Sequence, residues 1–322
     1  MRNAINTVVL ITLCASLAGA DYTFAGKWGS AGSGPGEFNV PAGLAVAPSG
    51  RVYVADSYNH RIQYFTGSGK YLGEWGTRGT GDGQFKYPVD VAITPAGRVY
   101  VVDFDNHRIQ YFTASGSFIG KWGVKGSAAS RFNNPNGIDY DPTLKRIYVA
   151  DTYNTRIQCF NGTGSFIGAW GSEGDNNGQF DQPFGVAVTN NGNVYVTDRL
   201  NNRVQYFDFA GNFIGKWGSE GYGYGQFQYP TAIEAAGDSR IYVTDYSWHQ
   251  VQCFDYTGSF ITRWGTKGTG DGKFTYPDGV AASPSSTTIY VADSGNHRIQ
   301  YFTRNEPAVV PTSVGKVKAL FR

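Results

Sequence analysis

A single unit recurs six times along the chain, and this repetition constrains the fold more than any other feature of the sequence. Each copy contains Tyr-Val, one further residue and an aspartate, and the copies end at Asp56, Asp103, Asp151, Asp198, Asp245 and Asp293. Successive aspartates are 47 or 48 residues apart. A fixed period of this length is typical of repeat architectures, in which each unit buries its apolar face against the next unit.

Four short runs with the composition of strands make up one unit. In the first copy they cover residues 43–47, 51–56, 61–66 and 70–75. They are rich in Val, Ile, Tyr and Phe without a helical period, and clusters of Gly, Pro and Ser separate them. The sequence therefore predicts an all-β fold, a six-bladed β-propeller whose blades are four-stranded antiparallel sheets.

The two ends of the chain predict how the ring closes. The sixth copy stops after its third strand, at residues 299–302, whereas residues 23–29 match the fourth strand of the second copy at residues 117–123. We therefore expect the N-terminal strand to complete the last blade. Six Trp-Gly pairs then give one to each blade, at Trp28, Trp75, Trp122, Trp170, Trp217 and Trp264. A seventh tryptophan, Trp248, stands outside this register.

The segments that flank the repeats indicate where the protein is located. Residues 1–20 have the pattern of a secretory signal peptide, with a basic start, an apolar run at 8–13 and small residues at 18–20. The apolar run is too short to span a bilayer, so we expect a secreted protein without a membrane partner. The propeller is expected at 21–303 and a flexible basic tail at 304–322.

Charge and cysteine content narrow the classes of partner. Residues 21–303 carry 22 basic and 24 acidic side chains. A nucleic-acid-binding domain usually presents a clearly basic face, and the bulk charge here does not favour one. Cys159 and Cys253 lie two repeats apart, farther than a disulfide can reach, so we predict free packed thiols. We expect a monomer.

The repeat also resembles a known family. A Pro-x-Gly triplet at 41–43, Tyr-Val-Ala-Asp at 53–56 and Asn-His-Arg-Ile-Gln-Tyr-Phe at 59–65 look like the NHL repeat, and the resemblance covers about residues 22–303. It implies a six-bladed propeller. Members of the family include RNA- or protein-binding domains of tripartite-motif ubiquitin ligases, the sensor domain of a bacterial receptor kinase, and peptidyl-amidoglycolate lyase.

One loop face is the predicted ligand-binding site. Because the strands alternate in direction, the loops between second and third strands share a face with the loops between blades. In the fifth copy Trp248 and Gln250 replace the usual Asn and Arg, which leaves Asp245 without its usual partner. The predicted ligand-binding residues are Tyr58, Phe104, Tyr153, Asp245, Tyr246 and Trp248. Aromatic side chains on a rigid face commonly anchor partners. The alternative is that these side chains pack locally between neighbouring loops.

The histidines and the channel acids are the candidate metal ligands. His60, His107, His249 and His297 occupy one repeat position in four separate blades, so we expect each to belong to its own loop and not to converge on zinc. The first strands carry Asp90, Asp139, Glu234 and Asp278. Facing one channel, these four acids could hold Ca²⁺, and the alternative is that they are simply hydrated. No other cofactor is expected.

The function predicted from the sequence is recognition rather than catalysis. A rigid scaffold with variable loops suits a secreted, non-enzymatic protein that binds a protein, a peptide or a glycan. The first alternative is a metal-dependent lyase or hydrolase related to peptidyl-amidoglycolate lyase. In that family, zinc-binding histidines follow proline on the first strand, and no Pro-His pair occurs in this chain. The second alternative is an RNA-binding NHL domain.

Overall fold

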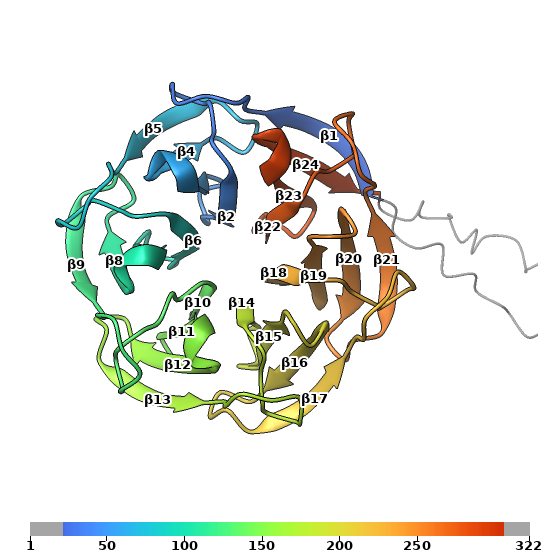
Figure 1. Ribbon diagram of the computed structural model, residues 1–322. Helices are drawn as coiled ribbons and strands as arrows, with labels where there is room; N and C mark the ends of the chain where they lie inside the picture. The colour runs from blue at the N-terminus through green and yellow to red at the C-terminus, as the bar shows by residue number, and fades with distance from the viewer. Residues whose placement is uncertain (1–21, 306–322) are drawn as a thin grey trace, which may run out of the picture.

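Each repeat folds as one four-stranded antiparallel sheet, and six such sheets form a ring around a central channel (Figure 1). The computed structural model describes residues 22–305. In five blades the strands run from the channel to the rim in sequence order, and in the sixth the outermost strand comes from the N-terminus. The predicted all-β six-bladed propeller is confirmed.

The strands of the first three blades have similar lengths. Blade 1 consists of β2 (Pro41–Val46), β3 (Val52–Asp56), β4 (Arg61–Phe65) and β5 (Tyr71–Trp75). Blade 2 consists of β6 (Pro88–Ile93), β7 (Val99–Asp103), β8 (Arg108–Phe112) and β9 (Phe118–Trp122). Blade 3 consists of β10 (Ile138–Asp141), β11 (Arg146–Asp151), β12 (Arg156–Asn161) and β13 (Phe166–Trp170).

The other three blades follow the same plan. Blade 4 consists of β14 (Pro183–Val188), β15 (Val194–Asp198), β16 (Arg203–Phe207) and β17 (Phe213–Trp217). Blade 5 consists of β18 (Pro230–Ala236), β19 (Arg240–Asp245), β20 (Gln250–Asp255) and β21 (Phe260–Trp264). Blade 6 consists of β22 (Pro277–Ala282), β23 (Thr288–Asp293), β24 (Arg298–Arg304) and β1 (Tyr22–Trp28). Short 3₁₀ helices follow the second strand in four blades: η1 (Ser57–Asn59), η2 (Phe104–Asn106), η3 (Thr152–Asn154) and η4 (Ser294–Asn296).

The hydrophobic core lies between neighbouring blades rather than inside any one of them. One cluster joins Tyr53 and Ile62 of blade 1 to Val99 and Phe112 of blade 2. The Trp-Gly tryptophans reinforce these interfaces: the ring of Trp75 packs 5.6 Å from that of Phe112 in the next blade. Burial of this kind contributes roughly 25 cal/mol per Å² of apolar surface, so each blade depends on its neighbours for stability.

A glycine allows a close contact between blades 1 and 2. Gly116, in the turn between the third and fourth strands of blade 2, has a φ of +89° and lies over the indole of Trp75. A Cβ atom at this position would come 2.7 Å from the ring, so only glycine fits both the turn and the contact.

The N-terminal strand closes the ring, as the sequence predicts. β1 pairs with β24 antiparallel, from Tyr22 opposite Arg304 to Trp28 opposite Ile299, and the two strands lie side by side in Figure 1. The Tyr22 hydroxyl also hydrogen bonds the Tyr242 hydroxyl of blade 5 at 2.6 Å. The last blade is therefore built from both ends of the propeller sequence.

Other expectations concern the termini and the cysteines. The predicted signal peptide at residues 1–20 lies outside the described residues, as does the part of the predicted tail from residue 306 onward. Within the described segment, no helix has the length and apolar character needed to cross a membrane. Cys159 and Cys253 are buried free thiols, as predicted.

Candidate binding face and central channel

The loops between second and third strands meet the loops between blades on one side of the ring, which we call the upper face. Backbone hydrogen bonds join the two sets, as where the Tyr58 N–H donates to the Asn39 carbonyl at 3.1 Å. The coiled segments in Figure 1 mark this face. The predicted sharing of one face by these loops therefore holds.

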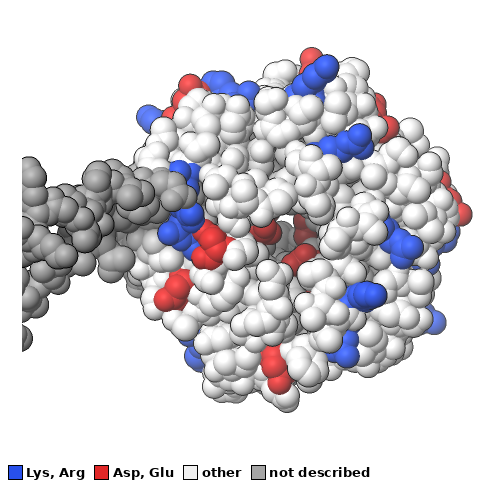
Figure 2. All heavy atoms as spheres, turned by 180° about the vertical axis from the view of Figure 1, so that it is seen from behind, with Lys and Arg blue, Asp and Glu red and all other residues white. Residues whose placement is uncertain are grey.

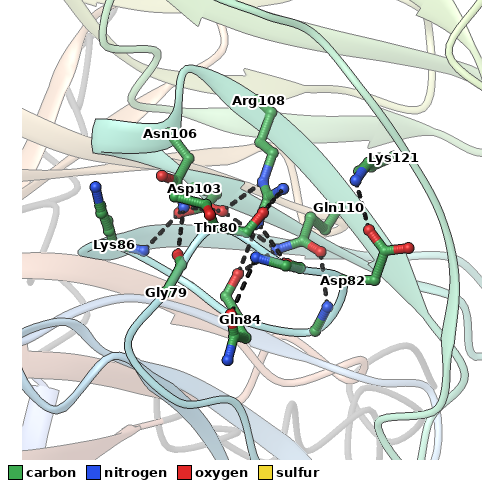
Figure 3. Close-up of polar contacts among 12 residues, drawn as sticks. Gly79, Thr80, Asp82, Gln84, Lys86, Asp103, Asn106, Arg108, Gln110 and Lys121 are labelled. Carbon is green, nitrogen blue, oxygen red and sulfur yellow. Dashed lines mark hydrogen bonds and ion pairs between the residues drawn. The ribbon is translucent and has the colours of Figure 1, made fainter.

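A buried polar network supports the loops of each regular blade, and Figure 3 shows it in blade 2. Asp103 is fully buried and accepts hydrogen bonds from Arg108 Nε at 2.7 Å and Asn106 Nδ2 at 2.9 Å. Arg108 also donates to the Thr80 carbonyl at 2.7 Å and the Gln84 carbonyl at 2.8 Å. Because a buried charge is stable only when it is paired and hydrogen-bonded, this network holds the inter-blade loop in place.

The histidines connect consecutive blades. His60 Nδ1 accepts the backbone N–H of Tyr87 at 3.2 Å, and His107 Nδ1 accepts that of Asn134 at 3.0 Å. In blade 4, Asn202 Oδ1 makes the same contact with the Tyr229 N–H at 3.0 Å. Each of these side chains thus ties its loop to a different inter-blade loop, and the described residues contain no group of three His, Cys, Asp or Glu placed to hold a metal ion.

The predicted aromatic residues of the upper face lie in different settings. Tyr58 and Tyr153 are about half exposed, at 54% and 53%, whereas Phe104 is partly buried. Tyr246 stacks on Tyr276 of the next blade, with ring centroids 4.8 Å apart. The six predicted residues therefore form no single patch, and their role in binding stays a prediction.

Blade 5 departs from the regular network in the way its sequence indicates. Asp245 is fully buried, and its carboxylate accepts only backbone N–H groups among the described contacts, including that of Trp248 at 3.3 Å. The buried Gln250 Nε2 has no hydrogen-bond partner. Burial therefore raises the pKa of Asp245 to about 7, despite the nearby charge of Arg263.

Trp248 fills part of the space around this altered network. Its ring packs edge-to-face on Tyr222, with centroids 4.9 Å apart. Arg263 of β21 lies over the rings of both Tyr222 and Tyr224, at 4.7 and 4.9 Å. Trp248 is thus partly engaged in local packing, the alternative raised above, while Tyr224 is 73% exposed at the rim.

A cluster of aromatic rings around an arginine spans blades 4 to 6 on the upper face, and this arginine was not among the predicted residues. The Arg199 guanidinium carbon lies 4.8 Å from the Phe184 ring centroid, 5.5 Å from that of Tyr229 and 5.8 Å from that of Tyr246. Tyr246 in turn stacks on Tyr276, so four aromatic rings belong to this group. We call these five residues the Arg199 cluster.

The sequence does contain a signal for the Arg199 cluster. The residue after the repeat aspartate is arginine only in blade 4, and elsewhere it is Ser57, Phe104, Thr152, Tyr246 or Ser294. Tyrosine precedes the leading proline in blades 2, 5 and 6. Neither position draws attention alone, because the cluster forms only when the ring places three blades side by side.

Three of the four channel acids hydrogen bond the backbone of the next blade. Asp90 accepts the Ile138 N–H at 3.0 Å, Asp139 accepts the Val188 N–H at 2.7 Å, and Glu234 accepts the Ala282 N–H at 3.1 Å. Each of these three therefore joins its first strand to that of the next blade. Burial raises the pKa of Asp90 and Glu234 to about 8, of Asp139 to about 7, and of Asp278 to about 6.

Cavities run along the channel and open on the lower face. A space of about 140 Å³ is lined by Asp90, Asp139 and Glu234 together with apolar strand residues. A second space of about 280 Å³ lies at the lower end, beside Pro48, Pro95 and Pro142. Figure 2, seen from the side opposite to Figure 1, shows acidic side chains inside the opening and basic side chains spread singly around the ring. Whether a cation enters this channel stays a prediction.

Comparison with known proteins identifies the repeat. The NHL repeat matches residues 38–65, 85–112, 132–160, 180–207 and 274–302. The unit of blade 5, with Trp248 and Gln250, is not among these segments. The human E3 ubiquitin-protein ligase TRIM32 is 52% identical over 46 residues, which is 14% of this chain and 7% of that protein. The chain thus spans only a small part of this relative.

Solved structures share the architecture at low sequence identity. A protein of unknown function from Bacteroides thetaiotaomicron has a TM-score of 0.69 and 17% identity, over 88% of this chain and 76% of its own. Virginiamycin B lyase from Staphylococcus aureus has a TM-score of 0.58 and 15% identity, over 88% of this chain and 100% of its own. At such identities the likeness concerns the fold alone.

Proposed function

We propose that this chain, a propeller built of NHL repeats, is a non-enzymatic binding protein that recognises a peptide segment of a partner on its upper face. The observation that carries the proposal is the Arg199 cluster, which presents one arginine and four aromatic rings across three blades. Tyrosine and arginine are enriched among the residues that dominate binding energy at protein interfaces.

Exposure within the cluster supports a role beyond packing. Tyr229 and Tyr276 are 38% and 41% exposed although they adjoin buried proline positions at the start of β18 and β22. A large aromatic surface left in contact with water at a rigid site gains free energy when a partner covers it. The rigid strands beneath keep the entropic cost of binding small.

A peptide fits this surface better than RNA or a substrate. Residues 21–303 carry 22 basic and 24 acidic side chains, so the propeller has no excess of basic charge to attract a polyanion. The channel carboxylates and the histidines already accept backbone N–H groups, so their contacts are explained by the scaffold. We therefore propose a peptide rather than a glycan as the ligand.

The cellular setting is part of the same proposal. The basic start and apolar run of residues 1–20 support secretion. The ring closes with its own N-terminal strand and so needs no second copy to complete a blade, which supports a monomer.

A selection experiment tests the proposal. A phage-displayed library of random dodecapeptides is selected on the immobilised protein, and the enriched peptides are titrated against two double variants. We expect Tyr229→Ala/Tyr276→Ala to weaken binding by tenfold or more. The matched control is Arg146→Ala/Phe209→Ala, which removes a cation–π pair of 5.6 Å at the lower loops and should leave binding unchanged. Failure to enrich any peptide, or equal binding to both variants, contradicts the proposal.

A further inference from the structure

Arg199 has hydrogen-bonding capacity that nothing in the described structure uses. Within residues 22–305 its side chain makes no hydrogen bond or ion pair, and its Nε atom is buried without a partner. By contrast, Arg203 of the same blade donates to Asp198 and to three backbone carbonyls. A guanidinium has five N–H donors, and leaving them unpaired near the protein surface is costly unless a partner or water accepts them.

The surrounding rings hold this cation in a defined position. Phe184, Tyr229 and Tyr246 lie within 5.8 Å of the guanidinium, and in the described part of the chain no other cation lies over three rings. Cation–π attraction replaces part of the lost hydration without using the N–H donors, which lie in the plane of the guanidinium. Arg199 is therefore pre-organised, with its donors available to an acceptor.

The local charges limit what that acceptor can be. Burial raises the pKa of Asp278, and the nearby charge of Arg199 offsets part of that rise, although the two side chains form no ion pair. Below them in the channel lie three more carboxyls, those of Asp90, Asp139 and Glu234. A single arginine balances one negative charge, so a ligand with one negative group and an otherwise neutral, aromatic or apolar surface fits better than a polyanion.

From this arrangement, and resting on the proposed function, we infer that Arg199 binds a carboxylate of the peptide partner while Tyr229, Tyr246 and Tyr276 pack against its neighbouring side chains. A carboxylate matches the planar fork of a guanidinium with two parallel hydrogen bonds, and few other peptide groups do. The carboxylate belongs either to an Asp or Glu side chain or to the C-terminus of the partner. The two sources share one chemistry, which the experiment separates.

The probes are synthetic octapeptide libraries, made once with free and once with amidated C-termini. The tightest binders of the wild-type protein are remade with each carboxylate converted to its amide, and both forms are titrated against wild type, Arg199→Met and Arg199→Lys. In the wild type we expect the amide form to bind tenfold or more weakly. In Arg199→Met the two forms should differ less than twofold, while Arg199→Lys, which keeps the charge but not the planar fork, should retain only part of the preference. Binders confined to the free-acid library identify a C-terminal carboxylate, and Asp- or Glu-dependent binders in both libraries identify a side chain.

Other outcomes separate failure of this inference from failure of the proposed function. Binding that is lost in Tyr229→Ala/Tyr276→Ala but is equal for acid and amide overturns the role of Arg199 and leaves the binding face intact. Peptide binding that is unchanged in the Arg199 variants and in Tyr229→Ala/Tyr276→Ala overturns both the role of Arg199 and the proposed function. Tight binding of a uridine 20-mer that weakens steeply with salt, in the absence of peptide binders, also overturns both. Unchanged thermal melting of the variants, measured in parallel, excludes misfolding as the cause of any loss.

Discussion

Arg263 Nη1 donates to the carbonyl oxygen of Tyr222 at 2.7 Å, and this hydrogen bond takes the place of one made elsewhere by an arginine of the third strand. In blade 2 the corresponding carbonyl belongs to Thr80 and the donor is Arg108. In blade 5, glutamine occupies the third-strand position, and a cation from the fourth strand reaches the same loop from outside. The loop keeps its support, but the buried aspartate beneath it loses its ion pair.

This loss predicts that Asp245 makes blade 5 sensitive to pH. Its pKa is raised to about 7 in the folded protein, against about 4 in an unfolded chain, so between these values the folded state binds more protons. The contribution of Asp245 to stability therefore falls as pH rises from 4 to 7 and stays low above that. We expect Asp245→Asn to raise the free energy of unfolding at pH 8 by up to about 4 kcal/mol, since one pKa unit corresponds to about 1.4 kcal/mol.

Urea unfolding of wild type and Asp245→Asn from pH 4 to pH 8 measures this effect. The stability difference should be small at pH 4 and grow toward pH 8. Asp56→Asn in blade 1 is the matched control, because it breaks a fully formed ion pair with Arg61 and should destabilise. A difference for Asp245→Asn that does not change with pH would show that its carboxyl is not protonated in the fold.

The regular network predicts a large cost for removing its arginine. Arg108→Met leaves Asp103 buried and without its ion pair. Breaking a buried ion pair typically lowers the free energy of unfolding by about 3 to 5 kcal/mol. Gln250 occupies the same position in blade 5, and its Nε2 has no hydrogen-bond partner, so Gln250→Met removes no ion pair and should cost less than about 1 kcal/mol. Denaturant unfolding of both variants at pH 7 checks the contrast, and equal losses would mean that the network contributes little.

The histidine contacts between blades predict a second, opposite pH effect. His107 Nδ1 must be unprotonated to accept the Asn134 N–H, and burial holds the pKa of His107 below its usual 6.5. Its contribution is therefore present above pH 6.5 and is lost as pH falls through the lowered pKa. We expect His107→Ala to cost about 1 to 2 kcal/mol at pH 7.5, with the cost shrinking toward pH 5.

A matched variant comes from the chain itself. Asn202 makes the equivalent contact to the Tyr229 N–H, so His107→Asn should keep nearly wild-type stability at pH 7.5 and lose the acid dependence. Thermal melts at pH 5 and 7.5 provide the comparison. The contact would have no energetic role if both variants matched the wild type at each pH.

Because β1 closes the ring, a separate peptide with the sequence of this strand should be able to bind a chain that lacks it. A chain beginning at residue 30 lacks the strand that pairs with β24 and lacks the Trp28 ring, which lies 6.0 Å from Tyr290. We expect the melting temperature of this shortened chain to be roughly 10 °C below that of the wild type, because an open ring exposes one interface between blades. A synthetic peptide of residues 22–29 should restore part of this loss, whereas a scrambled peptide should not. No response to either peptide would argue that closure does not depend on β1.

Much of the architecture could be predicted because the residues that determine it recur in every repeat. The position of Trp28 and the unfinished sixth copy were enough to predict closure by the N-terminal strand. The altered partners of Asp245 could also be predicted, since Asp, Asn and Arg stand at fixed spacing in the other copies. Such features depend on neighbours within one unit.

The Arg199 cluster could not be predicted in this way because it depends on how the ring is curved. Phe184, Arg199 and Tyr229 are separated in the sequence by 15 and 30 residues, and Tyr246 lies farther along still. Only the placement of blades 4 and 5 side by side brings their rings to one cation. For Trp248 the sequence shows the departure from the repeat but not its consequence. The packing of Trp248 against Tyr222 depends on a loop from another unit.

Photocrosslinking tests most directly the claim that the upper face of blades 4 to 6 is where a peptide binds. Benzoylphenylalanine is placed at position 276 in one sample and at position 209, on the lower loops, in another, and each is irradiated with a peptide selected on the wild-type protein. The account predicts a crosslink at position 276 that excess unlabelled peptide abolishes, and none at position 209. A crosslink at position 209 alone would contradict it.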